Sequence, residues 1–224
     1  TLAVPLPRCY HCEIGSAGAD FVLVLADMAP AEQGDQILGC GPQEARLAVT
    51  ALAGLHGPRW GDPAWLSFAA TVMPKPDEAT ARGLGDITVL AAQTTLDKLG
   101  ERLSADDRAT VSASAALIGD WLLAAPERFS LLHGDYRIDN LLFDPQRTRV
   151  TVVDWQTLAV GLPARDLSYF LATSLRPGDR VAHERELVED YRRLIGAGFM
   201  AEQALADQLV HPQVGLVQPE TAHA

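Results

Sequence analysis

The sequence predicts an α+β fold that is mainly helical and carries a few small β-hairpins. Apolar residues recur at helical spacing in several long segments, whereas other segments are short apolar runs flanked by turn-forming residues. The chain has 224 residues, of which 48% are hydrophobic and 21% charged, so it can bury a sizeable core. We therefore expect a globular protein made of one domain or of a fragment of two.

The first elements form a predicted hairpin. Residues 9–14 and 21–25 are β-prone, and the Gly- and Ala-containing segment 15–20 between them is typical of a turn. Regular alternation along the first strand would place the thiols of Cys9 and Cys12 on opposite faces. A zinc site at this Cys-x-x-Cys sequence is therefore a weak alternative, because the chain has no second paired motif.

Helices account for most of the remaining chain. A helix is predicted over 43–56, where apolar residues recur every three or four positions until Gly57 and Pro58 end the pattern. Segment 57–85 is rich in Gly, Pro and Trp and is predicted to be a loop with at most a short helical turn. Further helices are predicted at 87–99, 104–123, 164–174 and 180–195.

Three short strands interrupt this helical pattern. They are predicted at 129–132, 140–143 and 150–153, and the sequence Asp-Pro-Gln-Arg at 144–147 forms a turn between the last two. Polar side chains cluster where these strands end. We therefore expect the chemistry of the protein to reside in the loops that the small hairpins carry.

The charge balance excludes several classes of partner. Lys and Arg number 18 against 29 Asp and Glu, and the net charge of −11 repels nucleic-acid phosphates and anionic lipid surfaces. The longest apolar run, at 21–26, is far shorter than the roughly 20 residues that a membrane span needs, and no leader precedes it. With three cysteines and no leader, we expect free thiols in a cytoplasmic protein.

The densest chemical signal is the sequence His133-Gly134-Asp135, followed by Asn140 and, after the next hairpin, by Asp154. This spacing is what phosphoryl transfer from a magnesium-bound nucleotide requires. One carboxylate must receive the proton of the acceptor hydroxyl, and two further ligands must hold Mg²⁺, which prefers carboxylate and amide oxygens. Asn140 and Asp154 fit that second task.

The block 133–154 resembles the catalytic and metal-binding loops of the aminoglycoside phosphotransferase and choline kinase-like family, which has the protein-kinase fold. Gly134 in the middle of the His-x-Asp triplet is typical of that family. Segment 161–167 resembles the stretch in which an Asp at a helix start braces the catalytic loop. Upstream, 21–28 resembles the last N-lobe strand with the hinge, and 43–56 resembles the first long helix after it.

The resemblance implies a role for each residue of the motif. Asp135 would be the catalytic base, and Asn140 and Asp154 would ligate Mg²⁺. Asp27 and Met28, in the hinge-like segment, would flank the adenine through backbone contacts. The cofactors would then be ATP or GTP with Mg²⁺, and the partner a small molecule that carries a hydroxyl group.

Two further residues would support the site, and the resemblance also implies a division of the chain. His133 would pack beneath the catalytic loop, and Asp166 would brace that loop from the next helix. Residues 1–28 would be a remnant of an N-lobe, consisting of its last strands and the hinge. Residues 29–195 would be a kinase-like C-lobe, and 196–224 a weakly structured tail.

The chain departs from the family upstream of the predicted hinge. A complete member has a Gly-rich loop and a strand lysine there, and this chain has neither. Its two lysines, Lys75 and Lys98, fall in a predicted loop and a predicted helix farther along the chain. Losing these phosphate contacts could lower the rate by several orders of magnitude.

These observations favour one function and leave two alternatives open. The favoured function is transfer of the γ-phosphate of ATP or GTP to a hydroxyl of a small acceptor. The first alternative is a truncated, catalytically inactive relative that binds metal or nucleotide only. The second is a metal-dependent hydrolase that uses Asp135 and Asp154 on water.

Overall fold

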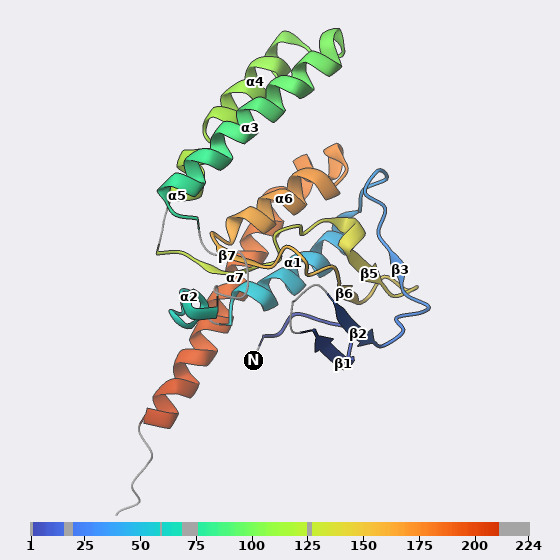
Figure 1. The fold of residues 1–224 in the computed structure, drawn as a ribbon. Helices are drawn as coiled ribbons and strands as arrows, with labels where there is room; N and C mark the ends of the chain where they lie inside the picture. Colours follow the sequence, from blue (N-terminus) through green and yellow to red (C-terminus); the bar gives the residue numbers. More distant parts are fainter. Residues whose placement is uncertain (1, 16–19, 59, 69–75, 125–126, 211–224) are drawn as a thin grey trace, which may run out of the picture.

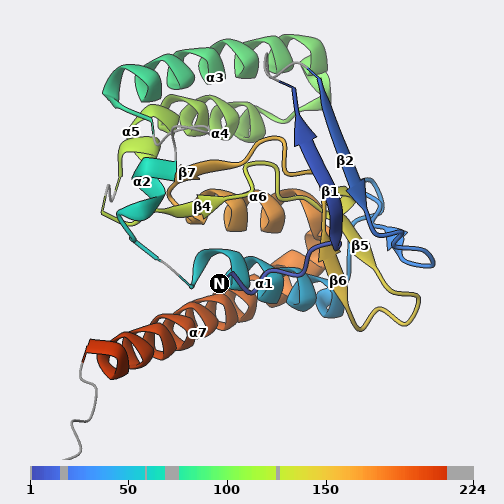
Figure 2. The same cartoon turned by 60° about the horizontal axis from the view of Figure 1, so that its bottom comes forward.

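The computed structural model describes residues 2–15, 20–58, 60–68, 76–124 and 127–210. Figure 1 shows a central body with a β-hairpin on one side and a pair of long helices that projects away from it. Figure 2 shows that α6 (Ala164–Ser174) lies between α1 (Pro42–His56) and this projecting pair. The predicted architecture, mainly helical with small β-hairpins, is confirmed.

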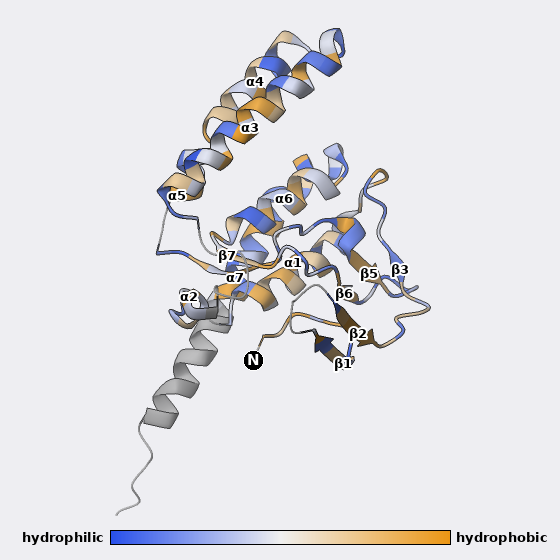
Figure 3. Cartoon of the chain, viewed as in Figure 1, coloured by the Kyte–Doolittle hydropathy of each residue, from blue (hydrophilic) through white to orange (hydrophobic). Residues whose placement is uncertain are grey.

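Helix α1 forms the centre of the body and matches the predicted helix closely. It begins with Pro42, which suits a helix start because Pro has no N–H to leave unsatisfied. The backbone N–H of Gly41 donates to the carboxylate of Glu44 at 3.1 Å, which ties the first turn together. Figure 3 shows that α1 is predominantly hydrophobic, as a helix surrounded by other elements should be.

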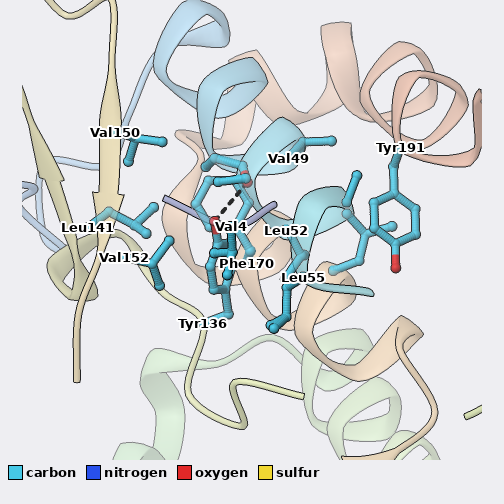
Figure 4. Close-up of a cluster of buried hydrophobic side chains, with 14 of the residues drawn as sticks. Val4, Val49, Leu52, Leu55, Tyr136, Leu141, Val150, Val152, Phe170 and Tyr191 are labelled. Atoms are coloured by element: carbon cyan, nitrogen blue, oxygen red, sulfur yellow. Dashed lines mark hydrogen bonds between the residues drawn. The ribbon is translucent and has the colours of Figure 1, made fainter. Parts of the chain in front are cut away.

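The main core lies between α1, α6 and the small hairpin of β5 (Leu141–Phe143) and β6 (Val150–Val152). Leu52 and Leu55 of α1 are buried against Phe170 of α6 and against Val152 (Figure 4). Tyr136 is also fully buried here, and its hydroxyl donates to the backbone carbonyl of Ala48 at 2.7 Å. The residue that follows Asp135 thus anchors the predicted catalytic loop to α1.

Within the described residues, the strands form three small antiparallel sheets with the orders β1–β2, β3–β5–β6 and β4–β7. The short strands β3 and β7 were not predicted, because strands of two or three residues carry almost no periodicity. The strands are β1 (Cys9–Ile14), β2 (Phe21–Leu25), β3 (Glu32–Gln33), β4 (Ser130–Leu132), β5 (Leu141–Phe143), β6 (Val150–Val152) and β7 (Ala159–Gly161).

A β-bulge in β1 corrects the expected placement of the two thiols. Cys9 pairs with Leu25 and Cys12 pairs with Leu23, because the register shifts by one residue between Cys9 and His11. Cross-strand partners share a face, and Leu23 and Leu25 are two residues apart, so both cysteines lie on one face. The prediction that Cys9 and Cys12 lie on opposite faces, which assumed regular alternation along β1, was therefore wrong. Among the described residues there is still no group of three His, Cys, Asp or Glu that could hold a metal.

The projecting pair consists of α3 (Glu78–Leu99) packed against α4 (Ala105–Ala116) and α5 (Ile118–Leu123). The prediction of a loop up to residue 85 was wrong over 78–85. Glycines at 83 and 85 weakened the helical pattern, yet the Asp77 carboxylate caps the helix by accepting from the backbone N–H of Thr80. Gly85 is needed for packing, because a Cβ there would lie 3.1 Å from the backbone nitrogen of Gly119.

The remaining helices are short α2 (Ala64–Phe68) and long α7 (Pro177–Val210). Helix α7 continues 15 residues beyond the predicted end at residue 195, so the expectation of a weakly structured chain from residue 196 was wrong over 196–210. Two glycines at 196 and 198 lower helix propensity by only about 1 kcal/mol each and do not end a helix by themselves. The rest of the expected tail, 211–224, lies outside the described residues. No described helix is long and apolar enough to cross a bilayer.

Candidate active site

The predicted catalytic loop connects two of the small sheets. It follows β4, which pairs with β7, and it ends in the 3₁₀ turn Ile138–Asn140 directly before β5. Because each end of the loop leaves a hydrogen-bonded strand, the backbone positions of its polar residues are fixed on both sides. Short loops held by rigid elements are where catalytic groups are usually placed.

Asp135 and Asn140 are in direct contact. The side-chain amide of Asn140 donates to the backbone carbonyl of Asp135 at 2.8 Å and to its carboxylate Oδ2 at 3.2 Å. Asn140 is only 5% exposed, so this contact is made in a protected environment. The amide nitrogen of Asn140 donates both of these hydrogen bonds to Asp135. The amide oxygen of Asn140 therefore remains available to bind a cation.

His133 joins this loop to the segment that carries Asp154. Its ring Nε2 lies 2.9 Å from the backbone oxygen of Val153, and its own carbonyl accepts from the hydroxyl of Thr157 at 2.9 Å. His133 is completely buried. Gly134 adopts a φ of +85°, and a Cβ there would lie 2.2 Å from the carbonyl oxygen of Thr157. The glycine of the motif is therefore required by the close approach of these two loops.

Asp154 directly follows a residue that is bonded to Asn140. The backbone N–H of Val153 donates to the backbone carbonyl of Asn140 at 3.0 Å, so the two predicted metal ligands belong to hydrogen-bonded neighbouring segments. Asp154 has a φ of +63° and an exposed side chain. One carboxylate and one amide oxygen suit Mg²⁺, which shares its remaining positions with nucleotide phosphates and water.

Asp166, at the start of α6, holds the catalytic loop from behind. Its carboxylate accepts the backbone N–H groups of His133 at 2.7 Å and of Gly134 at 3.0 Å. It also lies 3.2 Å from Nε2 of His56, the last residue of α1. Burial alone would raise the pKa of Asp166, but the hydrogen bonds from His56 and from the two amides lower it below the usual range.

The hinge-like residues lie apart from this cluster. Asp27 and Met28 line a cavity of about 640 Å³, and none of the residues that line it belongs to the catalytic loop. Its other walls come from the N-terminal segment, from α1 and from the β5–β6 hairpin, including Leu142. Leu142 lies two residues after Asn140, so a strand path of roughly 7 Å joins one wall residue of this cavity to a predicted metal ligand.

Two residues near Asp135 were not predicted from the sequence. The Nε of Arg137 lies 3.2 Å from the carboxylate of Asp135 and 3.2 Å from that of Asp139. Burial would lower the pKa of Arg137, but these two carboxylates raise it. On α6, burial and the charge of Asp135 raise the pKa of Tyr169. The arginine two positions after Asp135, the predicted catalytic base, could have been found from the sequence, whereas Tyr169 is brought close to Asp135 only by the fold.

The fold and the loop geometry agree with the outcome of a comparison with protein families. The model of the phosphotransferase enzyme family matches residues 1–202. The chain belongs to this family. The match includes the block 133–154 and the hinge-like segment 21–28. The resemblance inferred from the sequence is thereby confirmed.

Solved structures show that this phosphotransferase family member has the kinase-like fold expected from the sequence. A candidate aminoglycoside phosphotransferase from Ralstonia eutropha JMP134 is 19% identical with a TM-score of 0.53 over 87% of this chain. A glucosamine kinase is 18% identical with a TM-score of 0.50 over 91% of this chain. This chain spans only 61% and 55% of the length of those two chains.

Curated relatives of the phosphotransferase chain match over shorter stretches. Acyl-CoA dehydrogenase family member 10 of Mus musculus is 38% identical over 69 residues, which is 29% of this chain and 6% of that protein. Acyl-CoA dehydrogenase family member 11 of Homo sapiens is 45% identical over 42 residues, 18% of this chain and 5% of that protein. These relatives are therefore far longer than the part that they share with this chain.

Proposed function

We propose that the protein is a small-molecule kinase that transfers the γ-phosphate of ATP or GTP to a hydroxyl group of a small acceptor. The observation that carries this proposal is the direct contact of Asp135 with Asn140, beside the segment that ends in Asp154. A carboxylate fixed by an amide, next to two oxygen ligands for a hard cation, suits phosphoryl transfer to an alcohol. Family membership supports the same reaction class.

Asp135 is the proposed catalytic base. Its carboxylate is held by the amide of Asn140 and by the guanidinium of Arg137, so it stays fixed while the acceptor hydroxyl approaches. It accepts the proton of that hydroxyl as the new bond to phosphorus forms. Arg137 offers a cation beside the base.

Asn140 and Asp154 are the proposed ligands of Mg²⁺. The amide oxygen of Asn140 and the exposed carboxylate of Asp154 are hard oxygen donors on neighbouring segments. When bound, Mg²⁺ would neutralise charge on the transferred phosphate. His133 and Asp166 are proposed supports, since they connect the loop to Val153 and to α6.

The adenine is proposed to bind in the cavity that Asp27 and Met28 line. A volume of about 640 Å³ is in the range of small-molecule sites, and Leu142 connects its wall to Asn140. We also keep the division into an N-lobe remnant (1–28) and a kinase-like C-lobe (29–195) as a proposal. Every residue of β1 and β2 is exposed, including Phe21 at 71%, as expected if further β-structure covers this hairpin in a complete catalytic unit.

A thermal-shift titration tests nucleotide binding directly. We expect Mg-ATP or Mg-GTP to raise the midpoint of unfolding, because a ligand at about 100 times its dissociation constant adds roughly 2.7 kcal/mol of stability. Replacing Mg²⁺ with EDTA should remove most of that shift. The absence of any shift with either nucleotide would contradict the kinase proposal.

An acceptor screen then separates the kinase from its rivals. The panel should contain amino sugars and choline, and also hydroxylated acyl-CoA thioesters, because the curated relatives are named acyl-CoA dehydrogenase family members. A kinase consumes nucleotide only when an acceptor is present. Phosphate release without any acceptor would favour a metal-dependent hydrolase. Binding without turnover on any acceptor would favour the inactive relative that binds metal or nucleotide only.

A further inference from the structure

A chain of buried polar groups leads from the C-terminal helix to the catalytic loop. The hydroxyl of Tyr191, on α7, lies 2.6 Å from Nδ1 of His56. The other ring nitrogen of His56 lies 3.2 Å from the carboxylate of Asp166, which in turn accepts from the backbone of His133 and Gly134. His56 is fully buried, and Asp166 and Tyr191 are nearly so. Three helices and the catalytic loop thus share one hydrogen-bonded path.

The direction of the hydrogen bonds to Asp166 follows from the chemistry of a carboxylate. An ionised carboxylate only accepts, so Asp166 takes hydrogens from the two amides and from Nε2 of His56. In a neutral imidazole that donates from Nε2, Nδ1 is an acceptor, and a phenol O–H is the donor that satisfies it. Burial, and next the charge of Asp166, hold the pKa of Tyr191 above its usual range, so its hydroxyl keeps the proton that it donates.

The hydrogen-bonded path from Tyr191 to the loop also fixes the orientation of the side chains along it. With only one ring nitrogen bonded, the orientation of the buried His56 ring would rest on that bond and on packing alone. Tyr191 fixes the second nitrogen and also packs edge-on against the ring, with the centroids 5.9 Å apart and the planes at 89°. A fixed His56 holds one oxygen of Asp166, and the carboxylate then has one orientation in which both loop amides are served.

We propose that Tyr191 is a positioning residue of the phosphotransferase site, which acts through His56 and Asp166 to hold the backbone of His133 and Gly134. Helix α7 thereby helps to fix the backbone of the predicted catalytic loop, although α7 and this loop are separate segments of the chain. The consequence for catalysis rests on the proposed function, whereas the effect on the loop backbone does not. The two can therefore be tested separately.

Amide hydrogen exchange of Tyr191→Phe tests the effect on the loop. We expect the amides of His133 and Gly134 to exchange roughly fivefold faster, relative to the amides of the β5–β6 ladder, because one buried hydrogen bond of the path is lost. In a His56→Leu background the same substitution should change that ratio less than twofold, since the path is already broken. Unchanged relative exchange at His133 and Gly134 in Tyr191→Phe would overturn the proposal.

Leu187→Ala is the matched control. Leu187 is a buried residue of the same helix, one turn before Tyr191, and it belongs to the hydrophobic core. Its truncation destabilises the packing of α7 without removing a hydrogen bond, so it should accelerate the loop and the ladder amides equally. If Leu187→Ala changes the ratio as Tyr191→Phe does, loosened packing of α7 explains the effect and the proposal is wrong.

Kinetics provide a second readout once an acceptor is known. Because Tyr191 touches neither of the proposed substrate sites, Tyr191→Phe should lower kcat several-fold and leave the KM for nucleotide within twofold. A changed KM with an unchanged kcat would contradict a positioning role. If the wild-type chain shows no turnover at all, the proposed function fails, and the exchange experiment still decides the role of Tyr191.

Discussion

Asp135→Asn is expected to abolish acceptor-dependent consumption of nucleotide while leaving the fold intact. A positioned general base contributes roughly 10²- to 10⁴-fold to a reaction rate, and asparagine cannot accept the proton of the acceptor hydroxyl. The substitution keeps the size of the side chain, so the contacts with Asn140 and Arg137 lose charge rather than shape. Acceptor-dependent release of ADP or GDP, measured at saturating nucleotide, gives the effect on kcat.

Asp86→Asn is the control for that substitution. Asp86 is exposed on the projecting helix α3, so its replacement removes the same charge far from the catalytic loop. It should change both activity and the midpoint of thermal unfolding only slightly. Activity of Asp135→Asn within tenfold of the wild type would rule out Asp135 as the base.

Asp166→Asn is expected to cause the largest loss of stability among the single charge changes that we consider. The carboxylate accepts from two backbone amides and from His56 and is 2% exposed, so an asparagine would direct an amide group at donors that it cannot satisfy. We expect a loss of about 3 kcal/mol, which for a chain of this length lowers the unfolding midpoint by roughly 6 to 12 °C. Denaturant unfolding measures it.

The same substitution has a pH signature. The pKa of Asp166 is lower in the folded chain than the usual value of about 4, because the hydrogen bonds from His56 and the loop amides outweigh burial. Its contribution to stability is therefore complete above about pH 4 and is lost as the pH falls through the folded pKa. The difference between wild type and Asp166→Asn should shrink below pH 4. A difference that stays constant down to pH 2 would contradict an ionised Asp166.

Asp120→Asn serves as the matched control for stability. Asp120 also forms an ion pair, with Arg82, but it does so on the surface of the projecting helices. Exposed pairs contribute little, so this variant should lie within about 1 kcal/mol of the wild type. A comparable loss in both variants would mean that charge alone, and not the buried bracing of the loop, explains the effect of Asp166.

The contact between Asp135 and Asn140 was predictable, because the chemistry proposed for the block 133–154 dictates its spacing. Asp135 and Asn140 are five residues apart in the sequence and in contact in the structure. Gly134 was recognised as typical of the family, and its positive φ and close approach to Thr157 explain why glycine stands there. Hydrogen bonds between residues far apart in the sequence could not be predicted in this way. The helix predicted over 43–56 does end at His56, but the bonds of His56 to Asp166 and Tyr191 join positions more than 100 residues apart.

Errors in the predicted elements have specific physical causes. The bulge in β1 shifts the register by one residue, and no residue pattern in the strand announces it. Helix α3 begins at Glu78 rather than near residue 87, because packing of Gly85 against Gly119 outweighs the low helix propensity of glycine. At Gly85 a tertiary contact thus outweighed the local preference, whereas the bulge is a local irregularity of the exposed β1–β2 hairpin.

The most direct test of the site is titration with Mn²⁺ and a non-hydrolysable ATP analogue, followed by NMR of the ¹⁵N-labelled chain. A paramagnetic ion held by Asn140 and Asp154 should broaden the amide signals of both residues and of Asp135, and Asp154→Asn should remove that broadening. Broadening confined to other parts of the chain, or none at saturating nucleotide, would contradict the assignment of these residues to a magnesium-dependent phosphotransferase site.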